Sequence, residues 1–383
     1  MIIQLYGTNF INKGAELMLY AALKALVDLR PEVTIVSDLR CGTFRQRTAV
    51  GLQHLAWMYS KKYPFSETIV INLANLTPSY LRQMWRIVRE QEVNVVLDAS
   101  GFSYSDQLGP YAAELMATSS QRWKEQGKRI ILLPQAFGPF ETLRLKTAMS
   151  QVVENVDKIF ARDQVSYEHL MSISKKTAHI SIAPDFTCLV EGQLPKDFDS
   201  TVKRPCIIPN QRMIAETSSI VAKNYLPFLL RCANSLVGRG FEPFILVHET
   251  SQDYQLAMDL NTQLSKPLKI VREPDPLYLK GILGTCSLVI SSRYHGLMSA
   301  LSQGVPCIAT GWSHKYQALL EDYGCTEYLL PLDGSIEQLD NMIETLIAGS
   351  TRIDVVNRLI KVSSKQKQMA HEMWQQVMGI LND

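Results

Sequence analysis

The sequence predicts an α/β protein built from two Rossmann-like domains. The chain has 383 residues, and a typical domain of about 150 residues would give two to three domains. Short apolar segments alternate with amphipathic segments along most of the chain, which is typical of βαβ units and parallel sheets. The alternation stops once, in a proline-containing stretch at residues 191–205, and then starts again. We therefore expect two similar α/β halves.

The first domain is expected to span residues 1–190. It opens with an apolar strand at residues 2–6, a loop containing Gly and Asn, and a helix at about 14–28. Within that helix, Leu17, Ala21 and Ala25 recur at helical spacing. Further strands are expected at residues 33–36, 68–71, 94–97, 130–133, 158–160 and 180–182, with helices between most of them.

Residues 191–205 are expected to link the domains, because this stretch contains two prolines and shows little periodicity. The second domain should then span residues 206–353. Its strands are expected at residues 206–209, 243–247, 269–271, 287–290 and 306–309. A final helix at 354–383 carries an apolar stripe that includes Met369, Met373 and Val377. We expect this helix to pack back towards the first domain.

Composition and charge exclude several classes of function. The 39 Lys and Arg residues nearly balance the 37 Asp and Glu residues, so a nucleic-acid partner bound through a general basic field is not expected. No apolar run reaches the ~18–20 residues that span a bilayer, and the first residues lack a signal-peptide pattern. Seven widely spaced cysteines without a C-x-x-C motif indicate reduced thiols. We therefore expect a cytoplasmic protein without a metal site.

The strongest candidate site residues are Arg293 and His295. Ligands of open α/β sheets bind at the carboxyl ends of strands, so functional residues should directly follow strands, in the cleft between the halves. Arg293 and His295 follow the strand at 287–290 and open the next helix. A helix N-terminus favours negative charge, and the two cations next to it predict an anion site. The alternative is that His295 caps the helix and Arg293 pairs with a surface acid.

Neighbouring loops of the second domain carry further candidate cations. His314 and Lys315 follow the strand at 306–309, and Asn210 and Arg212 follow the strand at 206–209. Parallel strands deliver such loops to one edge of the sheet, so these side chains could converge with Arg293 on one anion. The alternatives are that Lys315 is a solvated residue at a helix start and that Arg212 is simply exposed.

The first domain offers candidate residues for a sugar. Gly14 and Glu16 follow the opening strand, and Asp98 and Asp106 lie in a Gly/Ser loop after a later strand, where carboxylates could bind hydroxyl groups. The alternative for Glu16 is ordinary complementarity to the helix dipole. Arg162 and Asp163 are expected to be mainly structural. The chain lacks G-x-G-x-x-G, H-E-x-x-H, G-x-S-x-G and P-loop motifs.

Taken in order, several motifs resemble the polysaccharide pyruvyl transferase family. The distinctive one is Ser-Arg-Tyr-His-Gly at residues 292–296, followed by Gly-Val-Pro at 304–306. The earlier landmarks are Gly7 with Asn-Lys-Gly-Ala-Glu at 12–16, Leu-Pro-Gln-Ala-Phe-Gly-Pro at 133–139, Ala-Arg-Asp-Gln-Val-Ser at 161–166 and Ala-Pro-Asp at 183–185. Together they extend over nearly the whole chain.

The resemblance implies a GT-B-like arrangement and a defined reaction. Members of the family move the enolpyruvyl unit of phosphoenolpyruvate onto two hydroxyls of a sugar, forming a pyruvate ketal on a surface glycan or its lipid-linked precursor. The resemblance assigns Arg293 and His295 to the binding of phosphoenolpyruvate. Arg212 is the nearest match to a further arginine that the family uses. The residues agree with this chemistry. A multiply charged anion needs several cations, and histidine is a suitable general acid near neutral pH. The scheme requires no cofactor and no metal.

Two other functions fit the sequence pattern. One is a GT-B glycosyltransferase that uses a nucleotide sugar, and the other is a non-catalytic glycan-binding relative. For an enzyme acting on a lipid-linked sugar, work at the inner face of the membrane is expected. The final helix carries Arg358, Lys361, Lys365 and Lys367, which could contact anionic lipid, although a solvated face is the alternative.

Overall fold

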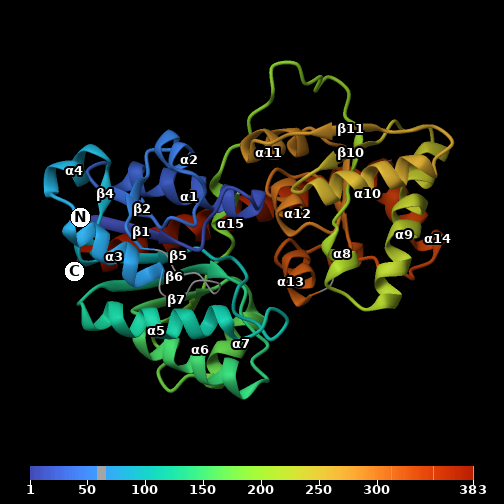
Figure 1. The fold of residues 1–383 in the computed structure, drawn as a ribbon. Helices are drawn as coiled ribbons and strands as arrows, with labels where there is room; N and C mark the ends of the chain where they lie inside the picture. The colour runs from blue at the N-terminus through green and yellow to red at the C-terminus, as the bar shows by residue number, and fades with distance from the viewer. Residues whose placement is uncertain (58–65, 312, 348, 383) are drawn as a thin grey trace. The chain divides into compact units, whose positions relative to one another are not determined.

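The computed structural model describes residues 1–57, 66–311, 313–347 and 349–382, which form two α/β units (Figure 1). The first unit contains Met1–Phe186 together with the end of the last helix from Met369. The second unit contains Thr187–Gln368. Each unit has its own parallel sheet, so the α/β class predicted from the alternating pattern is confirmed.

In the first unit, the described strands form one parallel sheet in the order β4-β3-β2-β1-β5-β6-β7-β8. The strands are β1 (Ile2–Tyr6), β2 (Thr34–Ser37), β3 (Gln53–Leu55), β4 (Ile87–Val88), β5 (Val95–Asp98), β6 (Arg129–Gln135), β7 (Lys158–Ala161) and β8 (Ile180–Ile182). The helices are α1 (Lys13–Leu29), α2 (Phe44–Ala49), α3 (Ser66–Leu76), α4 (Ser79–Met84), α5 (Tyr111–Glu125), α6 (Leu143–Asn155) and α7 (Gln164–Ile173). Figure 1 shows α5 and α6 side by side on one side of this sheet.

One expected strand of the first unit is wrong. Residues 68–71 lie inside helix α3, although their β-branched side chains favour a strand. The physical reason is that Ile71 and Ala74 face inward while Ile69, Leu73 and Leu76 are exposed, which is a helical repeat. The sheet edge is formed instead by β3 and β4, and strands of three and two residues are too short to show a pattern.

In the second unit, the described strands form a parallel sheet in the order β11-β10-β9-β12-β13. The strands are β9 (Pro205–Ile208), β10 (Phe244–Val247), β11 (Lys269–Arg272), β12 (Leu288–Ser291) and β13 (Cys307–Ala309). The helices are α8 (Arg212–Ala215), α9 (Ser219–Gly238), α10 (Ser251–Thr262), α11 (Pro276–Gly284), α12 (Tyr294–Leu301), α13 (His314–Asp322), α14 (Ile336–Ile347) and α15 (Gly349–Asn382).

Two boundaries of the second unit differ from the expected ones. Helix α15 begins at Gly349, a few residues before the expected start. The expected linker at 191–205 begins inside the second unit, where it lies against α11. The Gln193 N–H donates to the Leu277 carbonyl at 3.0 Å, and a Cβ on Gly281 would lie 1.7 Å from the Gln193 carbonyl oxygen. Glycine at 281 therefore permits a close backbone approach.

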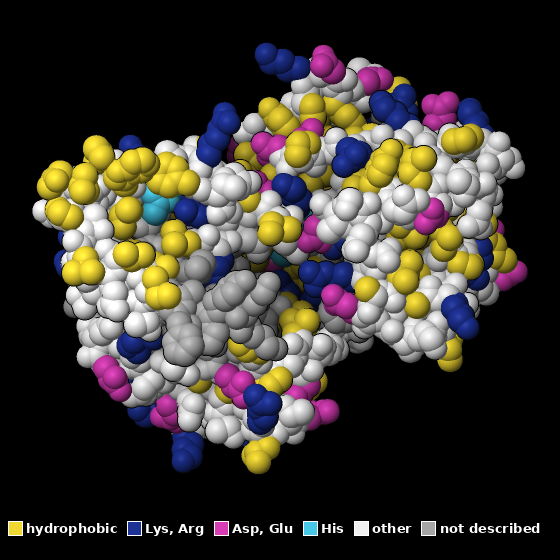
Figure 2. Space-filling view, in the orientation of Figure 1, with side chains coloured by type: hydrophobic (Ala, Val, Ile, Leu, Met, Phe, Trp, Pro, Cys, Tyr) yellow, Lys and Arg dark blue, Asp and Glu magenta, His cyan; other side chains and the backbone are white. Residues whose placement is uncertain are grey.

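The surface of the first unit carries exposed hydrophobic side chains near α2 and α4 (Figure 2). Within the described ranges, no helix is both long and apolar enough to cross a membrane. All seven cysteines lie in the described part of the chain, and each is buried and outside any disulfide.

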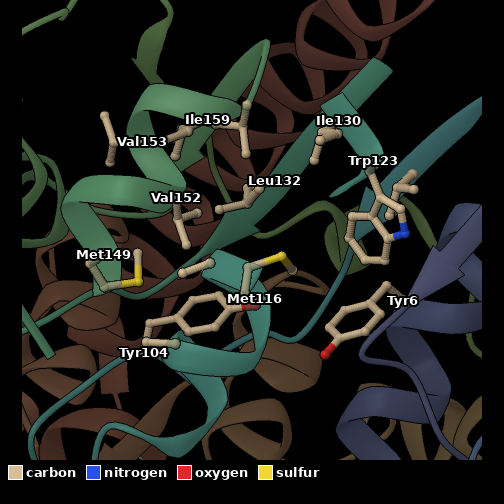
Figure 3. Close-up of a cluster of buried hydrophobic side chains, with 14 of the residues drawn as sticks. Tyr6, Tyr104, Met116, Trp123, Ile130, Leu132, Met149, Val152, Val153 and Ile159 are labelled. Carbon is tan, nitrogen blue, oxygen red and sulfur yellow. The ribbon is translucent and has the colours of Figure 1, made fainter. Parts of the chain in front are cut away.

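The core of the first unit lies between the sheet and helices α5 and α6 (Figure 3). Tyr6 at the end of β1 packs against Trp123 of α5, with their ring centroids 5.9 Å apart. The indole Nε1–H of Trp123 donates to Glu90 at 2.8 Å, so this buried polar atom is satisfied. This packing holds the carboxyl end of β1 firmly at the edge where the loops of the first unit gather.

Candidate functional site

The order of strands in the second unit defines a crevice at the carboxyl ends of β9 and β12. The chain leaves β9 towards β10 on one side of the sheet, and β12 lies on the other side. Loops that diverge from such a point leave room for a ligand. The residues that follow these two strands are 209–212 and 292–295, which include the predicted Arg212, Arg293 and His295.

Arg293 precedes α12 and is buried between two carboxylates. Its Nη2 donates to the Asp253 carboxylate oxygens at 2.6 and 2.5 Å, and its Nη1 forms an ion pair with Glu249. Asp253 is fully buried and Glu249 nearly so, so the alternative of a surface acid is not what the structure contains. Burial lowers the pKa of Arg293 to about 10, so the guanidinium is still charged at neutral pH.

Arg293 also retains one donor for a further partner. Its Nε atom is buried and has no hydrogen-bond partner within the described residues. A buried N–H without a partner costs free energy, which a bound acceptor would recover.

Burial raises the pKa of Asp253, the partner of Arg293, while backbone N–H groups of Gln211 and Thr250 oppose that change. The ion pair is therefore a buried, hydrogen-bonded centre and not a surface contact.

Ser292 fastens the loop after β12 to its neighbours. Its carbonyl oxygen accepts from Asn210 Nδ2 at 2.6 Å and from the Tyr316 hydroxyl at 2.8 Å. The Ser292 hydroxyl forms a hydrogen bond with the Tyr225 hydroxyl. The Tyr225 hydroxyl also accepts from the Asn210 N–H at 3.0 Å. Three elements distant in sequence therefore hold the Arg293 loop in one conformation.

His295 lies in the first turn of α12 and is partly exposed, unlike its buried neighbours Arg293 and Tyr294. Its ring meets the Tyr294 ring edge-on, with centroids 5.2 Å apart. A Cβ at Gly296 would lie 2.9 Å from Ile208 Cδ1, so glycine lets α12 pack closely on β9. His295 therefore lies in the first turn of a helix that packs tightly on β9.

His314 and Lys315 begin α13, directly beside this loop. Tyr316, the next residue, stacks edge-on against Tyr294 at 6.4 Å between ring centroids and donates to the Ser292 carbonyl. Lys315 Nζ lies 5.5 Å from the centroid of the Tyr316 ring, a distance typical of a cation–π contact. The structure thus brings residues 314–316 next to the 292–295 loop, as the neighbouring-strand argument predicts.

Arg212 is the exposed cation of the group. It begins α8, its side chain is 43% exposed, and its Nη1 lies 3.7 Å from Glu216. The preceding N–H, of Gln211, donates to Asp253 at 2.8 Å. The positive charge of Arg212 also contributes to lowering the pKa of Arg293. Arg212 therefore belongs to the same electrostatic site, on its open side.

Residue-by-residue reading of the sequence missed Glu249 and Asp253. Both follow β10, and Asp253 lies in the first turn of α10, where Thr250 and Asp253 form a capping box. The rule that located Arg293, namely residues that follow a strand, would have found them if it had been applied to the strand at 243–247. Tyr225 and Tyr316 were missed as well, because a tyrosine within a helix looks like an ordinary core residue.

In the first unit, Asp98 ends β5 and is fully buried. It accepts from the Tyr104 hydroxyl at 2.7 Å, from the Ser100 N–H at 3.0 Å and from Gln135 Nε2 at 3.2 Å. Burial raises the pKa of Asp98 despite these donors. The carboxylate is thus enclosed by protein donors and shapes the loop, so direct contact of Asp98 with a sugar would require that loop to rearrange.

Gly7 and Ser100 bring the loops after β1 and β5 into contact. Gly7 has φ of 80°, and a Cβ there would lie 2.1 Å from Ser100 Oγ. Glycine is required for both reasons. The two neighbouring strands therefore end in a joined loop pair at the edge of the sheet where ligands of such folds bind.

The other predicted residues of the first unit have identifiable partners. Gly14 and Glu16 lie in the first turn of α1, where Glu16 forms an ion pair with Lys13 at 2.6 Å and accepts from Tyr20 at 3.1 Å. Asp106 accepts from Thr142 Oγ1 at 2.5 Å and from the Glu141 N–H. Burial alone would raise the pKa of Asp106, but these hydrogen bonds outweigh it and lower the pKa. Asp106 thus fastens its loop to the start of α6.

Arg162 and Asp163 join the middle landmarks of the chain. Arg162 forms a buried ion pair with Asp185 at 3.1 Å, and Asp163 caps α7 by accepting from the Ser166 N–H at 2.7 Å. Ser166 Oγ in turn accepts from the Phe137 N–H at 2.9 Å. The motifs at 133–139, 161–166 and 183–185 therefore hold one another in place. No group of three or more His, Cys, Asp or Glu side chains suited to a metal occurs among the described residues.

Known proteins resemble this chain in both fold and sequence. The Anabaena protein HepE, solved with UDP-glucose, has a TM-score of 0.62 at 12% identity, covering 100% of this chain and 99% of its own. The UDP-GlcNAc 2-epimerase of Neisseria meningitidis, solved with UDP-GlcNAc, has a TM-score of 0.60 at 10% identity, covering 100% of each chain. At such low identity these structures establish the GT-B-like fold alone.

Sequence comparison goes further. The amylovoran biosynthesis protein AmsJ of Erwinia amylovora is 23% identical over 294 residues, which are 69% of this chain and 68% of AmsJ. The family model for polysaccharide pyruvyl transferases matches residues 12–314. That range contains the joined landmarks of the first unit and reaches through the Arg293 and His295 loop to His314. By this match, the chain belongs to the polysaccharide pyruvyl transferase family.

Proposed function

We propose that this enzyme transfers the enolpyruvyl unit of phosphoenolpyruvate to two hydroxyls of a sugar in an exopolysaccharide or its lipid-linked precursor, and releases phosphate. The observation that carries the proposal is the gathering of cations at one sheet edge. Arg212, His295, His314 and Lys315 lie at the starts of α8, α12 and α13, and the buried Arg293, paired with Glu249 and Asp253, holds the loop before α12. Several positive groups beside two helix N-termini suit a small, multiply charged anion.

In this proposal, His295 is the general acid. It gives a proton to the methylene carbon of phosphoenolpyruvate, which leaves an oxocarbenium ion at C2. A sugar hydroxyl forms a bond to C2 and its proton restores His295. The C2–O bond to phosphate then breaks, with the electron pair leaving on phosphate. A second hydroxyl attacks C2, its proton passes to phosphate or solvent, and the ketal closes.

The cations have separate proposed roles. Arg212 and Lys315, on the open side, would neutralise the phosphate as it leaves. Arg293 is charged but already paired with Glu249 and Asp253, so its proposed contribution is the free Nε donor and the fixed position of its loop. For the acceptor sugar, we propose the loops after β1 and β5, with Gly14 and Glu16 at their margin. We place the reaction in the cytoplasm, which is supported by seven cysteines that form no disulfide.

A ligand screen followed by an assay tests the proposal. Phosphoenolpyruvate at about 100 times its dissociation constant should add roughly 2.7 kcal/mol of stability in thermal unfolding, whereas UDP-glucose at the same concentration should add little. Phosphate release that depends on a sugar acceptor should follow. Stabilisation by UDP-glucose alone would instead favour a nucleotide-sugar glycosyltransferase. Stabilisation by phosphoenolpyruvate without phosphate release from any acceptor would favour a non-catalytic glycan-binding relative.

A further inference from the structure

The first unit exposes a group of large apolar side chains that no part of the described chain covers. Each is about half exposed or more, and Leu76 is 82% exposed. We call this group the apolar patch; it consists of Phe44, Ile69, Leu73, Leu76, Tyr80, Met84 and Trp85. Figure 2 shows hydrophobic side chains gathered over this end of the unit. Single exposed apolar residues are normal, but a cluster of this size marks an interaction surface.

The patch is formed by three consecutive helices. On α3, Ile69, Leu73 and Leu76 recur at spacings of four and three, so they share one face of the helix. Trp85, just after α4, meets the ring of Phe44 on α2 edge-on, with centroids 6.2 Å apart. The next residue, Arg86, has φ of 50°, which is uncommon for a residue other than glycine. The turn that presents Trp85 is therefore a specific feature of the fold.

Core packing does not account for these side chains. The inner side of α3 already supplies Ala74, which is buried, and Ile71, which packs against the core cluster. An ordinary surface helix is apolar on its inner face and polar on its outer face. Helix α3 also carries the apolar Ile69, Leu73 and Leu76 on its outer side, beside the exposed Asn72 and Asn75, and none of the described residues covers them.

The charges around the patch indicate which partner it fits. Residues 68–89 contain no Asp or Glu and three arginines, of which Arg82 and Arg89 are paired with Glu92, and Arg45 lies beside Phe44 on α2. Arg45 and Arg86 are exposed. Apolar side chains combined with Tyr, Trp and Arg are typical of surfaces that enter the interface of a bilayer, where anionic headgroups attract the arginines. A second copy of the chain fits less well, since a two-fold contact would bring arginine-bordered surfaces together.

We propose that the apolar patch is a docking surface for a membrane that contains anionic lipids. Helices α3 and α4 would lie in the plane of the interface, with Leu76, Tyr80 and Trp85 among the acyl chains and headgroups. This surface is distinct from the basic stretch of α15 at 358–367. There Arg358 is paired with Glu327 at 2.8 Å, and only Ile353 and Ile360 are exposed large apolar residues among the described side chains of that helix.

Docking would hold the enzyme next to the lipid-linked sugar of the proposed reaction, and that advantage rests on the proposed function. Binding to lipid itself is independent of the reaction. It can therefore be measured on the full chain without phosphoenolpyruvate, and the failure of one proposal leaves the other standing.

The test is sedimentation of the full chain with vesicles of phosphatidylcholine alone or mixed with phosphatidylglycerol. We expect binding to the mixed vesicles, reduced about tenfold or more in the double variant Leu76→Ser/Tyr80→Ser. Arg45→Glu should reduce binding about fivefold or more, because a headgroup attraction is replaced by repulsion. The matched control is Leu143→Ser, since Leu143 is 80% exposed but lies on α6, outside the patch. It should bind like the parent.

Tryptophan fluorescence reports whether the apolar patch enters the bilayer. Trp85 is the exposed tryptophan of the patch, while Trp57, Trp123 and Trp374 are buried. Mixed vesicles should shift the emission of the parent to the blue, and Trp85→Phe should lose most of that shift. Equal thermal stability of each variant and the parent would show that the fold is intact.

Three results would overturn the proposal. The parent could fail to bind either type of vesicle. The double variant could bind mixed vesicles as tightly as the parent. Alternatively, light scattering could show that the parent is a dimer and the double variant a monomer, with unchanged vesicle binding, which would assign the patch to a second copy of the chain. Vesicle binding without any phosphate release would leave docking intact and refute only the proposed reaction.

Discussion

Removal of the Arg293 charge should destabilise the fold in a way that depends on pH. Arg293 is the shared cation of Glu249 and Asp253, whose side chains are 6% and 0% exposed. In Arg293→Met, the two carboxylates would be left without that cation in a buried site. Breaking a buried ion pair from one side typically costs about 3–5 kcal/mol, so we expect a loss of that size in the free energy of unfolding at neutral pH.

The variant should regain stability as the pH falls. Burial already raises the pKa of Asp253 with Arg293 present, and loss of the cation should raise it further. A carboxyl whose pKa is higher in the folded than in the unfolded protein stabilises the fold when protonated, and this contribution is lost as pH rises through the folded pKa. Urea unfolding of Arg293→Met from about pH 5 to about pH 8 should therefore give a stability that falls with pH more steeply than in the parent.

A neutral replacement of the whole cluster supplies the control. The triple variant Arg293→Met/Glu249→Gln/Asp253→Asn removes all three charges, and buried ion pairs replaced in full are often nearly neutral for stability. The amide introduced at position 253 would keep an oxygen that can accept from the Gln211 N–H. We expect the triple variant to recover most of the lost stability and to show no added pH dependence. If Arg293→Met were as stable as the parent at every pH, the cluster would not be a buried ion pair in solution.

Other predictions concern the donor site and the first unit. His295→Ala should lower turnover by about 10²–10⁴-fold while phosphoenolpyruvate still raises the melting temperature, because it removes the proposed acid and leaves the cations. Arg212→Ala should instead weaken that thermal shift, most at low salt; unchanged binding would remove Arg212 from the donor site. Gly7→Ala should cost more unfolding free energy than Gly51→Ala, as measured in urea. Both glycines have positive φ, but only at Gly7 would the new Cβ strike Ser100; equal losses would mean that the loop contact is unimportant.

Much of the fold follows from local pattern. Buried strands such as β6 and β12 contain uninterrupted apolar runs, and the helices between such strands repeat at helical spacing, so the parallel α/β class was evident from the sequence. Residues 68–71 of helix α3 were predicted as a strand, because four β-branched residues in a row fit either structure. Strands β3 and β4 gave no signal, since their pairing to β2 and to each other depends on distant partners.

In the candidate site, too, some features follow from the local sequence and others depend on contacts between distant segments. That Arg293, His295, Arg212, His314 and Lys315 follow strands could be read from the chain, because parallel strands all end at one edge. By itself, the sequence thus determined the class of fold, the family and the edge at which to look. Only the tertiary structure decided the environment of each side chain. It paired Arg293 with Asp253, 40 residues away, and enclosed Asp98 among Ser100, Tyr104 and Gln135. Burial and ion pairing arise from contacts between distant segments, which local periodicity does not encode.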